Sequence, residues 1–311
     1  MLENGHAHHH ACHTDQKRLL WALGITVAFA ATELVGGLLA NSLALLSDAG
    51  HMAGDVAALG LSLFALWFAG RPPTEAKTFG YRRAEVVAAF VNAAALLVIT
   101  GFIFYEAYRR FLAPPSVQSE LMMGVAVAGL LANVASAWIL CGGSRENLNM
   151  RGAFLHVLGD LLGSVGAVAA AVIIMLTGWI LADPIISAFI GLLIVTSAAR
   201  LLARSLHVLM EGVPAHLSYR DIATAILAVP GVIDVHDLHV WSITTGFSAL
   251  SCHVVIADEF RSSDILNRLQ GMLRERFGID HATLQLERSS VCPGGVCCAP
   301  GAKVAGTKRG K

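Results

Sequence analysis

A short pattern that can bind a metal ion occurs twice in the chain. The pattern H-x-x-G-D is formed once by His51 and Asp55 and again by His156 and Asp160. On an α-helix, residues four apart lie on the same face, with Cβ atoms about 5–6 Å apart. If the two faces meet, two imidazoles and two carboxylates converge, and such a set of two nitrogen and two oxygen ligands suits tetrahedral Zn²⁺. The repetition therefore predicts one metal site formed by these four residues.

Both copies lie inside long apolar segments, where ionisable side chains are costly and usually functional. Two alternative roles for the four side chains remain open. They could form a proton relay, or they could bond neighbouring helices, as polar residues in membranes often do. The recurrence of one pattern in two separate segments favours the metal site.

The composition is that of a membrane protein. Apolar residues make up 55% of the 311 residues and charged residues only 14%, against about a quarter charged in soluble proteins. Disorder is excluded by the apolar content, and the balance of 22 basic and 22 acidic residues argues against nucleic-acid binding. A bilayer-spanning helix needs about 20 apolar residues. Six segments are long enough, which predicts an all-α membrane domain of six transmembrane helices: 19–40, 43–68, 84–111, 120–141, 152–177 and 181–206.

A smaller α+β domain is expected after the membrane helices. We place a His-rich N-terminal tail at 1–16, the membrane domain at 17–208, the second domain at 209–290 and a Cys-containing tail at 291–311. Ser218 is a candidate N-cap, and alternation predicts a strand with Leu250, Cys252, Val254 and Ile256 on one face. The order of elements (helix, strand, strand, helix, strand) fits a small antiparallel sheet with helices on one face.

Basic residues are concentrated in alternate loops, which predicts the topology. Arg71, Lys77, Arg82 and Arg83 lie between the second and third segments, whereas no Lys or Arg lies between the first and second. Lys and Arg collect in short cytoplasmic loops. Both termini and the smaller domain are therefore expected in the cytoplasm, in a multi-pass protein of the cell (inner) membrane.

Several motifs together resemble one family. They are E-L-V-G-G at 33–37, N-S-L-A-L-L-S-D-A-G-H-M-A-G-D at 41–55, T-F-G-Y-R-R-A-E at 78–85, H-V-L-G-D-L-L-G-S-V-G at 156–166, E-G-V-P at 211–214 and H-D-L-H-V-W at 236–241. The chain is similar in these segments to the cation diffusion facilitators, and in particular to the bacterial zinc, cadmium and cobalt efflux branch.

The resemblance carries several implications. It implies six transmembrane helices, a cytoplasmic metallochaperone-like domain, a homodimer, and exchange of metal for protons by alternating access. It also places the transport ligands on His51, Asp55, His156 and Asp160. Histidine rather than aspartate at the first of these positions is associated with zinc preference in the family.

A second candidate metal site lies in the smaller domain. His236, His253, His281 and Glu287 all lie on or beside expected strands. The resemblance implies that His236, His253 and Glu287 match zinc ligands of this domain, whereas Gln285 stands where some relatives have a ligating His. Ordinary strand-surface histidines remain the alternative.

The two ends of the chain carry further metal-binding residue types. His8, His10, Cys12 and His13 belong to a short His-rich tract that could capture metal, unless the tract is an added tag. Near the other end, Cys292 and Cys297 could form a weak thiolate site, without the paired C-x-x-C framework of a strong one.

Other polar residues are expected to have different roles. The segment 70–85 contains no His, Asp or Cys, so a loop metal site found in some relatives is expected to be absent. Glu33, Asn92 and Asn133 are expected to bond neighbouring helices or line the ion's route. Asp48 could either attract cations at an outer mouth or cap the second helix.

The sequence thus predicts a transporter and not an enzyme. A metalloenzyme would need an open coordination position, and no H-E-x-x-H motif occurs. A metal sensor would need a further output domain, whereas a passive channel stays open as an alternative. We expect no cofactor, with Zn²⁺ as substrate and as a regulatory ion. The expected partners are the lipid bilayer, divalent metal ions, protons and a second copy of the chain.

Overall fold

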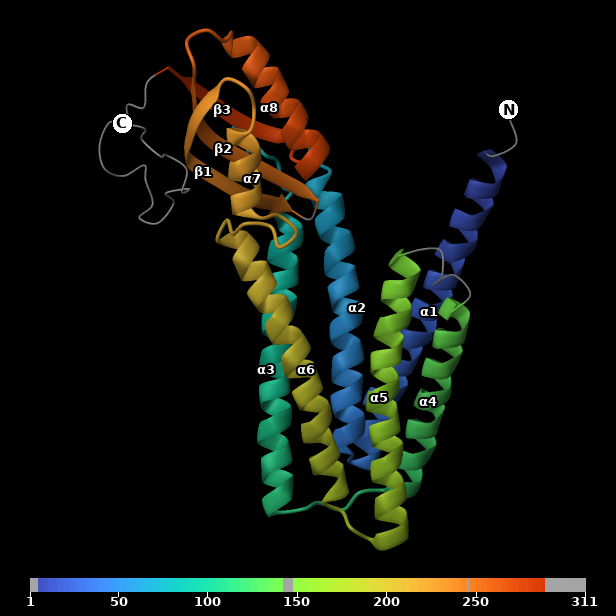
Figure 1. The fold of residues 1–311 in the computed structure, drawn as a ribbon. Coiled ribbons are helices and arrows are strands. Elements are labelled where there is room, and N and C mark those ends of the chain that lie inside the picture. Colours follow the sequence, from blue (N-terminus) through green and yellow to red (C-terminus); the bar gives the residue numbers. More distant parts are fainter. Residues whose placement is uncertain (1–4, 142–147, 245, 289–311) are drawn as a thin grey trace. The chain divides into compact units, whose positions relative to one another are not determined.

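Six long helices precede a small domain of three strands and two helices (Figure 1). The computed structural model describes residues 5–141, 148–244 and 246–288, and the side chains of these except 5–20, 22, 59, 62, 63, 66, 69 and 148–156. The long helices are α1 (Gly5–Ala40), α2 (Leu43–Ala69), α3 (Ala84–Leu112), α4 (Ser119–Cys141), α5 (Leu148–Thr177) and α6 (Ala182–Leu209). The small domain contains α7 (Tyr219–Leu227), β1 (Val232–Thr244), β2 (Phe247–Ile256), α8 (Ser262–Phe277) and β3 (His281–Glu287).

The long helices agree with the six segments expected from the sequence. Among the described residues, five of them contain a stretch apolar enough to cross a membrane, and α2, with 27 residues, is the sixth. The predicted class, a helical membrane domain followed by an α+β domain, is therefore confirmed.

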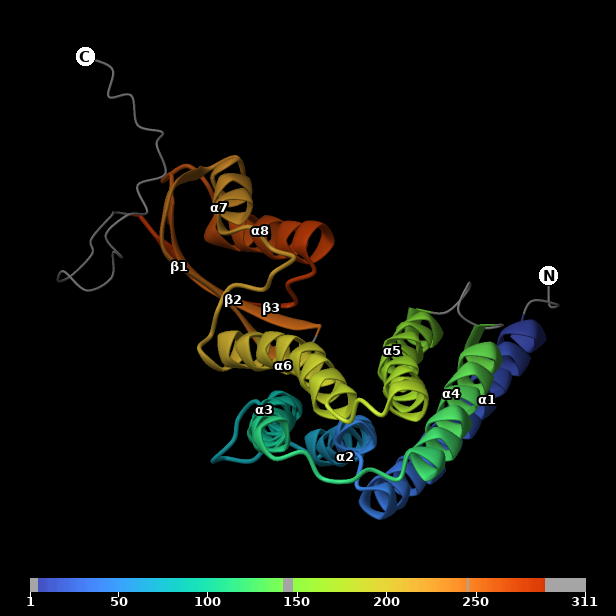
Figure 2. The ribbon, with the colours of Figure 1, turned by 90° about the horizontal axis from the view of Figure 1, so that it is seen from below.

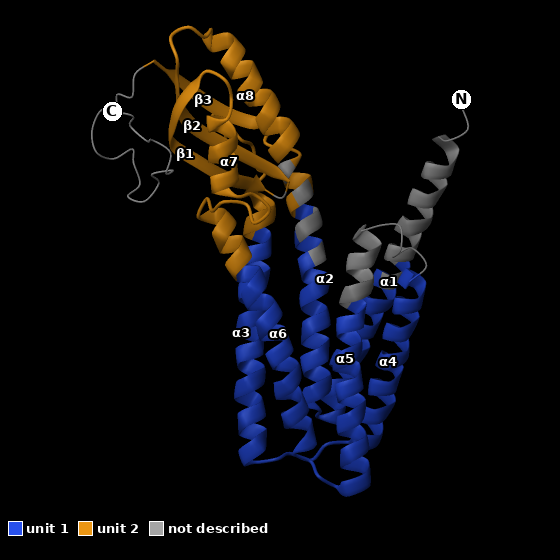
Figure 3. Cartoon of the chain, viewed as in Figure 1, with its two compact units in different colours: residues 1–64, 88–202 blue, residues 65–87, 203–311 orange. Residues whose placement is uncertain are grey.

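The chain divides into two compact units (Figure 3). One contains residues 1–64 and 88–202, and the other contains residues 65–87 and 203–311. The connection between α2 and α3 thus belongs with the small domain. Within this second unit, Thr244 donates a hydrogen bond to Glu85 (2.7 Å), and Phe79 lies edge-on to His281, with ring centroids 5.3 Å apart.

Small residues bring the helices of the first unit close together. α1, α4 and α5 lie side by side in both views (Figures 1 and 2). A Cβ atom on Gly36 of α1 would lie only 2.6 Å from Val125 of α4, so this contact requires glycine. Close approach through small residues is the usual way in which membrane helices associate, because lipid offers no hydrophobic drive between them.

The beginning of α2 is capped by a residue from another helix. Asp183 at the start of α6 accepts hydrogen bonds from the hydroxyl of Ser42 (2.6 Å) and from the backbone N–H groups of Leu43 (2.8 Å) and Ala44 (3.1 Å). The first N–H groups of a helix have no partner within the helix, and Asp183 supplies one. Asp48 is therefore not the cap of this helix. At 1% exposure it does not lie at an open mouth either.

The sheet of the second unit is mixed, which corrects the expectation of an antiparallel sheet. The strand order is β1-β2-β3, with β1 antiparallel to β2 but β2 parallel to β3. A helix between two neighbouring strands carries the chain back to the starting edge, so the strands run parallel. The connection through α8 has this effect.

The core of the small domain matches its predicted pattern. Leu250, Cys252, Val254 and Ile256 of β2 are all at most 2% exposed and pack in one cluster with buried residues of α7 and α8. Both helices therefore cover the same face of the sheet (Figure 2). The Ser218 hydroxyl accepts a hydrogen bond from the N–H of Asp221, which confirms the predicted N-cap of α7.

Candidate metal centres

Three of the four predicted membrane ligands converge in the first unit. His51 and Asp55 are on α2 and Asp160 is on α5. The two nitrogens of the His51 ring face the two carboxylates, with Nδ1 3.7 Å from Asp55 and Nε2 3.5 Å from Asp160. One ligand atom from each of the three side chains lies within 4.8 Å of the others. We call these three residues the membrane cluster.

The burial of the membrane cluster is graded. The side chain of Asp160 is 4% exposed, whereas those of His51 and Asp55 are 22% and 21% exposed. The cluster is thus more deeply buried at Asp160 on α5 than at its two residues on α2. The side chain of His156 lies outside the described residues. Its backbone is helical and lies one turn before Asp160, where side chains share a face.

A second group of ligands lies on the sheet. His236 of β1 and His253 of β2 are directly paired across the antiparallel ladder, and their ring centroids are 5.2 Å apart. Glu287 at the end of β3 contacts both imidazoles, His253 Nδ1 at 2.9 Å and His236 Nε2 at 3.5 Å. The three residues, each 14–29% exposed, form the sheet cluster. Two imidazoles and a carboxylate are a zinc donor set with one position open.

The structure adds a residue that the sequence reasoning missed. A carboxylate oxygen of Asp237 lies 3.9 Å from His253 Nε2, and Asp237 also pairs with His239 at 2.9 Å. Asp237 has a positive φ of 51°, where the register of β1 gains one residue against β2. Such a bulge redirects a side chain that strict alternation would place on the opposite face. The only signal in the sequence was its position directly after His236.

His281, predicted as a member of the second site, does not join it. β3 pairs with β2 so that His281 lies opposite Ala249 whereas Glu287 lies opposite Val255. Glu287 is six positions further along the strand than His281, which is about 20 Å at 3.3 Å per residue. His281 instead contacts the rings of Phe79 and Phe247. Its environment is aromatic packing.

Two neighbours define the chemistry of the sheet cluster. Gln285 donates a hydrogen bond to Glu287 (2.7 Å) and so holds its carboxylate in place without offering a third imidazole. Cys252 is on the same strand as His253, but burial, and to a smaller extent the charge of Asp237, raises the pKa of its thiol to about 12. Only a thiolate binds metal well. At neutral pH Cys252 is therefore a packing residue.

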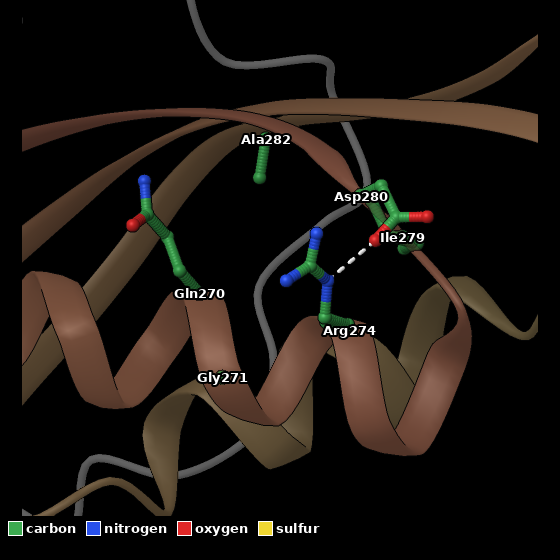
Figure 4. Close-up of a pocket in the computed structure, with 6 residues that line it drawn as sticks. All are labelled: Gln270, Gly271, Arg274, Ile279, Asp280 and Ala282. Atoms are coloured by element: carbon green, nitrogen blue, oxygen red, sulfur yellow. Dashed lines mark hydrogen bonds and ion pairs between the residues drawn. The ribbon is translucent and has the colours of Figure 1, made fainter.

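A shallow hollow on the small domain carries no comparable chemistry (Figure 4). It is lined by α8 and the start of β3, and the ion pair of Arg274 with Asp280 (2.6 Å) spans one side of it. Both charges are satisfied by each other, and both side chains are more than 60% exposed. The terminal candidates lie outside the described residues: the side chains of His8, His10, Cys12 and His13, and all of Cys292 and Cys297.

Both parts of the chain match known protein families. Residues 19–210 match the cation efflux transmembrane domain, and residues 214–289 match the cytoplasmic domain of cation efflux proteins. The chain belongs to the cation efflux family. The resemblance inferred from the motifs is thereby confirmed.

Close relatives of this cation efflux protein extend over nearly its whole length. The zinc transporter ZitB of Escherichia coli is 47% identical over 91% of this chain and 92% of its own. The cadmium, cobalt and zinc/H(+)-K(+) antiporter of Bacillus velezensis is 42% identical over 92% of this chain and 93% of its own. The metal cation efflux system protein CzcD of Cupriavidus metallidurans is 43% identical over 91% of this chain and 90% of its own.

Among solved structures, the cation efflux protein is similar to the metal-bound C-terminal domain of CzcD from Cupriavidus metallidurans. The two sequences are 38% identical in the matched region, which covers 23% of this chain and 99% of that domain, and the TM-score is 0.22. The match to the transmembrane family and the sequence similarity to ZitB identify this chain as a multi-pass membrane protein.

Proposed function

We propose that the chain exports divalent metal ions, with Zn²⁺ as the main substrate and Cd²⁺ and Co²⁺ as further ones, in exchange for protons. The observation that carries the proposal is the membrane cluster. Its imidazole and two carboxylates converge from two helices of the first compact unit, which we call the membrane unit. The family and the names of the relatives point to transport of the same ions. The activity is transport rather than catalysis.

The chemistry of the ligands explains why protons would move across the membrane in the direction opposite to the metal ion. A metal ion binds neutral imidazole and ionised carboxylate, so binding releases protons and protonation releases the metal. Free imidazole titrates near neutral pH, so a site built on imidazole and carboxylate ligands can exchange a metal ion for protons under ordinary conditions. Alternating exposure of such a site converts an inward proton gradient into metal efflux.

The sheet cluster fits a regulatory ion rather than a transported one. It lies in the small domain, outside the membrane helices, and offers two imidazoles and a carboxylate. We infer that it binds Zn²⁺ as intracellular zinc rises. The topology proposed with it places both termini and the small domain in the cytoplasm, in the inner membrane, with the functional protein a homodimer. The terminal His and Cys residues would then meet cytoplasmic metal.

Proton coupling is tested with the full-length protein in liposomes that contain a zinc-sensitive dye. We expect Zn²⁺ uptake to follow the size and direction of an imposed pH gradient. Uptake should stop when a proton ionophore collapses the gradient. A passive channel predicts the opposite, because its zinc flux would continue unchanged without the gradient.

We expect Glu287→Gln to weaken zinc binding at the sheet cluster by at least about tenfold, because loss of an outer partner of a ligand alone costs 10–100-fold. The binding is measured by competition with a zinc dye on the full-length protein carrying Asp160→Asn, so that the membrane cluster contributes little. The matched control is Glu259→Gln, an exposed carboxylate of the same domain. Equal affinity of Glu287→Gln and the control would exclude Glu287 as a ligand.

A further inference from the structure

The connection between α2 and α3 carries an excess of basic residues. Residues 70–85 contain four basic side chains, Arg71, Lys77, Arg82 and Arg83, and two acidic ones, Glu75 and Glu85. Two of the basic side chains have partners within the second unit. Arg83 pairs with Glu211 (3.0 Å), and Arg82 lies over the ring of Phe247, 4.7 Å from its centroid. The other two form no ion pair within the part of the chain that the structure describes, so their charges are available to an anion.

Both of these cations lie on aromatic rings. The guanidinium carbon of Arg71 is 4.6 Å from the ring centroid of Trp67 and 4.9 Å from that of Phe68. The Lys77 ammonium is 5.4 Å from the ring centroid of Tyr81, and the rings of Phe68 and Tyr81 contact each other at 4.4 Å. These five residues form one continuous group, which we call the aromatic–basic patch. An aromatic face attracts a cation without neutralising it, so the patch keeps two positive charges.

Backbone hydrogen bonds hold the aromatic–basic patch in place. The N–H of Arg71 donates to the carbonyl of Phe68 in the last turn of α2 (3.2 Å). Thr74 and Lys77 exchange two backbone hydrogen bonds (3.1 and 3.0 Å), and the Lys77 carbonyl also accepts from Gly80 (2.8 Å). Gly80 has a φ of 69°, a conformation that favours glycine. Since the two cations are already positioned, a ligand that binds them pays little for ordering the protein.

The place of the patch in the chain indicates which anion would bind. The patch begins in the last turn of α2, directly after an apolar helix of 27 residues, which is long enough to cross a bilayer. Trp67 is 62% exposed, and Trp and Tyr are enriched where a membrane meets water. Arginine binds phosphate through paired hydrogen bonds, and lysine binds it as a point charge. Exposed rings beside unpaired cations therefore fit a molecule that has both a phosphate and acyl chains.

We propose that the aromatic–basic patch binds an anionic phospholipid, with the phosphate on Arg71 and Lys77 and the acyl chains beside Trp67. A zwitterionic phospholipid carries the same phosphate, but its own cationic group competes for it. The patch therefore prefers a headgroup with a net negative charge, such as phosphatidylglycerol. The inference does not depend on metal transport, and it is tested without metal ions.

The test is native mass spectrometry of the full-length protein in detergent, freed of divalent ions, which resolves each bound lipid. Dioleoylphosphatidylglycerol and dioleoylphosphatidylcholine are titrated separately at two concentrations of ammonium acetate. We expect phosphatidylglycerol to bind more tightly, and its affinity to fall at the higher salt concentration because exposed charges are screened. The double variant Arg71→Gln with Lys77→Gln should bind it at least about tenfold more weakly, since each basic residue near a membrane surface contributes about fivefold.

The matched control removes two charges elsewhere. Arg220→Gln with Arg268→Gln changes exposed residues of α7 and α8 and should leave the affinity for phosphatidylglycerol unchanged. The proposal is wrong if the two lipids bind equally, or if the patch variant binds phosphatidylglycerol as the control does. Displacement of the lipid by an equal concentration of inorganic phosphate would make free phosphate the ligand and overturn the choice of a lipid. If the patch variant fails to fold, Arg71→Gln alone is compared with Arg220→Gln in the same titration.

Discussion

Asp160→Asn is expected to lower zinc transport by at least about 100-fold, because it removes a charged ligand rather than an outer partner, whose loss already costs 10–100-fold in affinity. The Asp160 side chain is 4% exposed and lies 3.5 Å from the second nitrogen of His51. Asparagine has nearly the same volume but carries no charge, so the packing of α5 persists while the donor set loses a carboxylate. The measurement is the initial rate of zinc uptake in liposomes at a fixed pH gradient, with the amount of inserted protein determined for each variant.

The control for Asp160→Asn is Glu120→Gln, which removes a carboxylate from the exposed first turn of α4. It should transport at the wild-type rate. His51→Ala and His156→Ala extend the series, and each should lose transport to a similar degree if all four residues bind one ion. Wild-type transport by His156→Ala would leave a site of three ligands, and wild-type transport by Asp160→Asn would contradict the metal site itself.

The helices and strands followed from the sequence because each depends on a local pattern. The length of the apolar segments defined the membrane helices, and the alternation of apolar and polar residues placed Leu250 and Val254 in the core of the small domain. The meeting of His51 with Asp160 was predictable for a different reason. The same pattern occurs in two apolar segments, and each copy carries a charged side chain that is costly inside a membrane. Few arrangements of the helices give both charges a partner, and packing the two patterns against each other is one of them.

The features that the sequence did not predict depend on contacts between distant segments. The parallel pairing of β2 with β3 puts His281 and Glu287 at opposite ends of one strand, and no local pattern determines that register. Asp237 reaches His253 only through the bulge in β1.

Asp183 is an example of such a distant contact with a large effect on stability. Its carboxylate caps α2 and also lies 3.7 Å from the guanidinium of Arg110 on α3, which in turn donates to the backbone oxygen of Asn41 (2.7 Å). Asn41 has a positive φ of 53° in the turn between α1 and α2. Four elements of the membrane unit, α1, α2, α3 and α6, are thus connected through one buried carboxylate.

We expect Asp183→Ala to destabilise the protein by about 3–5 kcal/mol, the usual cost of removing one partner of a buried ion pair. The variant leaves Arg110, which is 9% exposed, with Glu106 as its remaining carboxylate partner (3.1 Å). It also leaves the hydroxyl of Ser42 and two backbone N–H groups of α2 without their acceptor. Asp183→Asn should cost less, because its amide oxygen still accepts from some of these donors. The measurement is the free energy of unfolding in mixed micelles, with the melting temperature as a second readout.

The matched control is Arg109→Ala, which removes the neighbouring arginine on the same helix. Arg109 is 64% exposed and pairs with Glu106 at 3.5 Å, so its loss should change the free energy of unfolding by less than about 1 kcal/mol. The contrast separates the buried network from a general effect of charge at this end of α3. Equal effects of Asp183→Ala and Arg109→Ala would mean that the carboxylate does not stabilise the start of α2. Because Asp183 is distant from the proposed metal ligands in sequence and makes none of the contacts of the membrane cluster, the folded fraction of Asp183→Asn should still bind zinc with wild-type affinity.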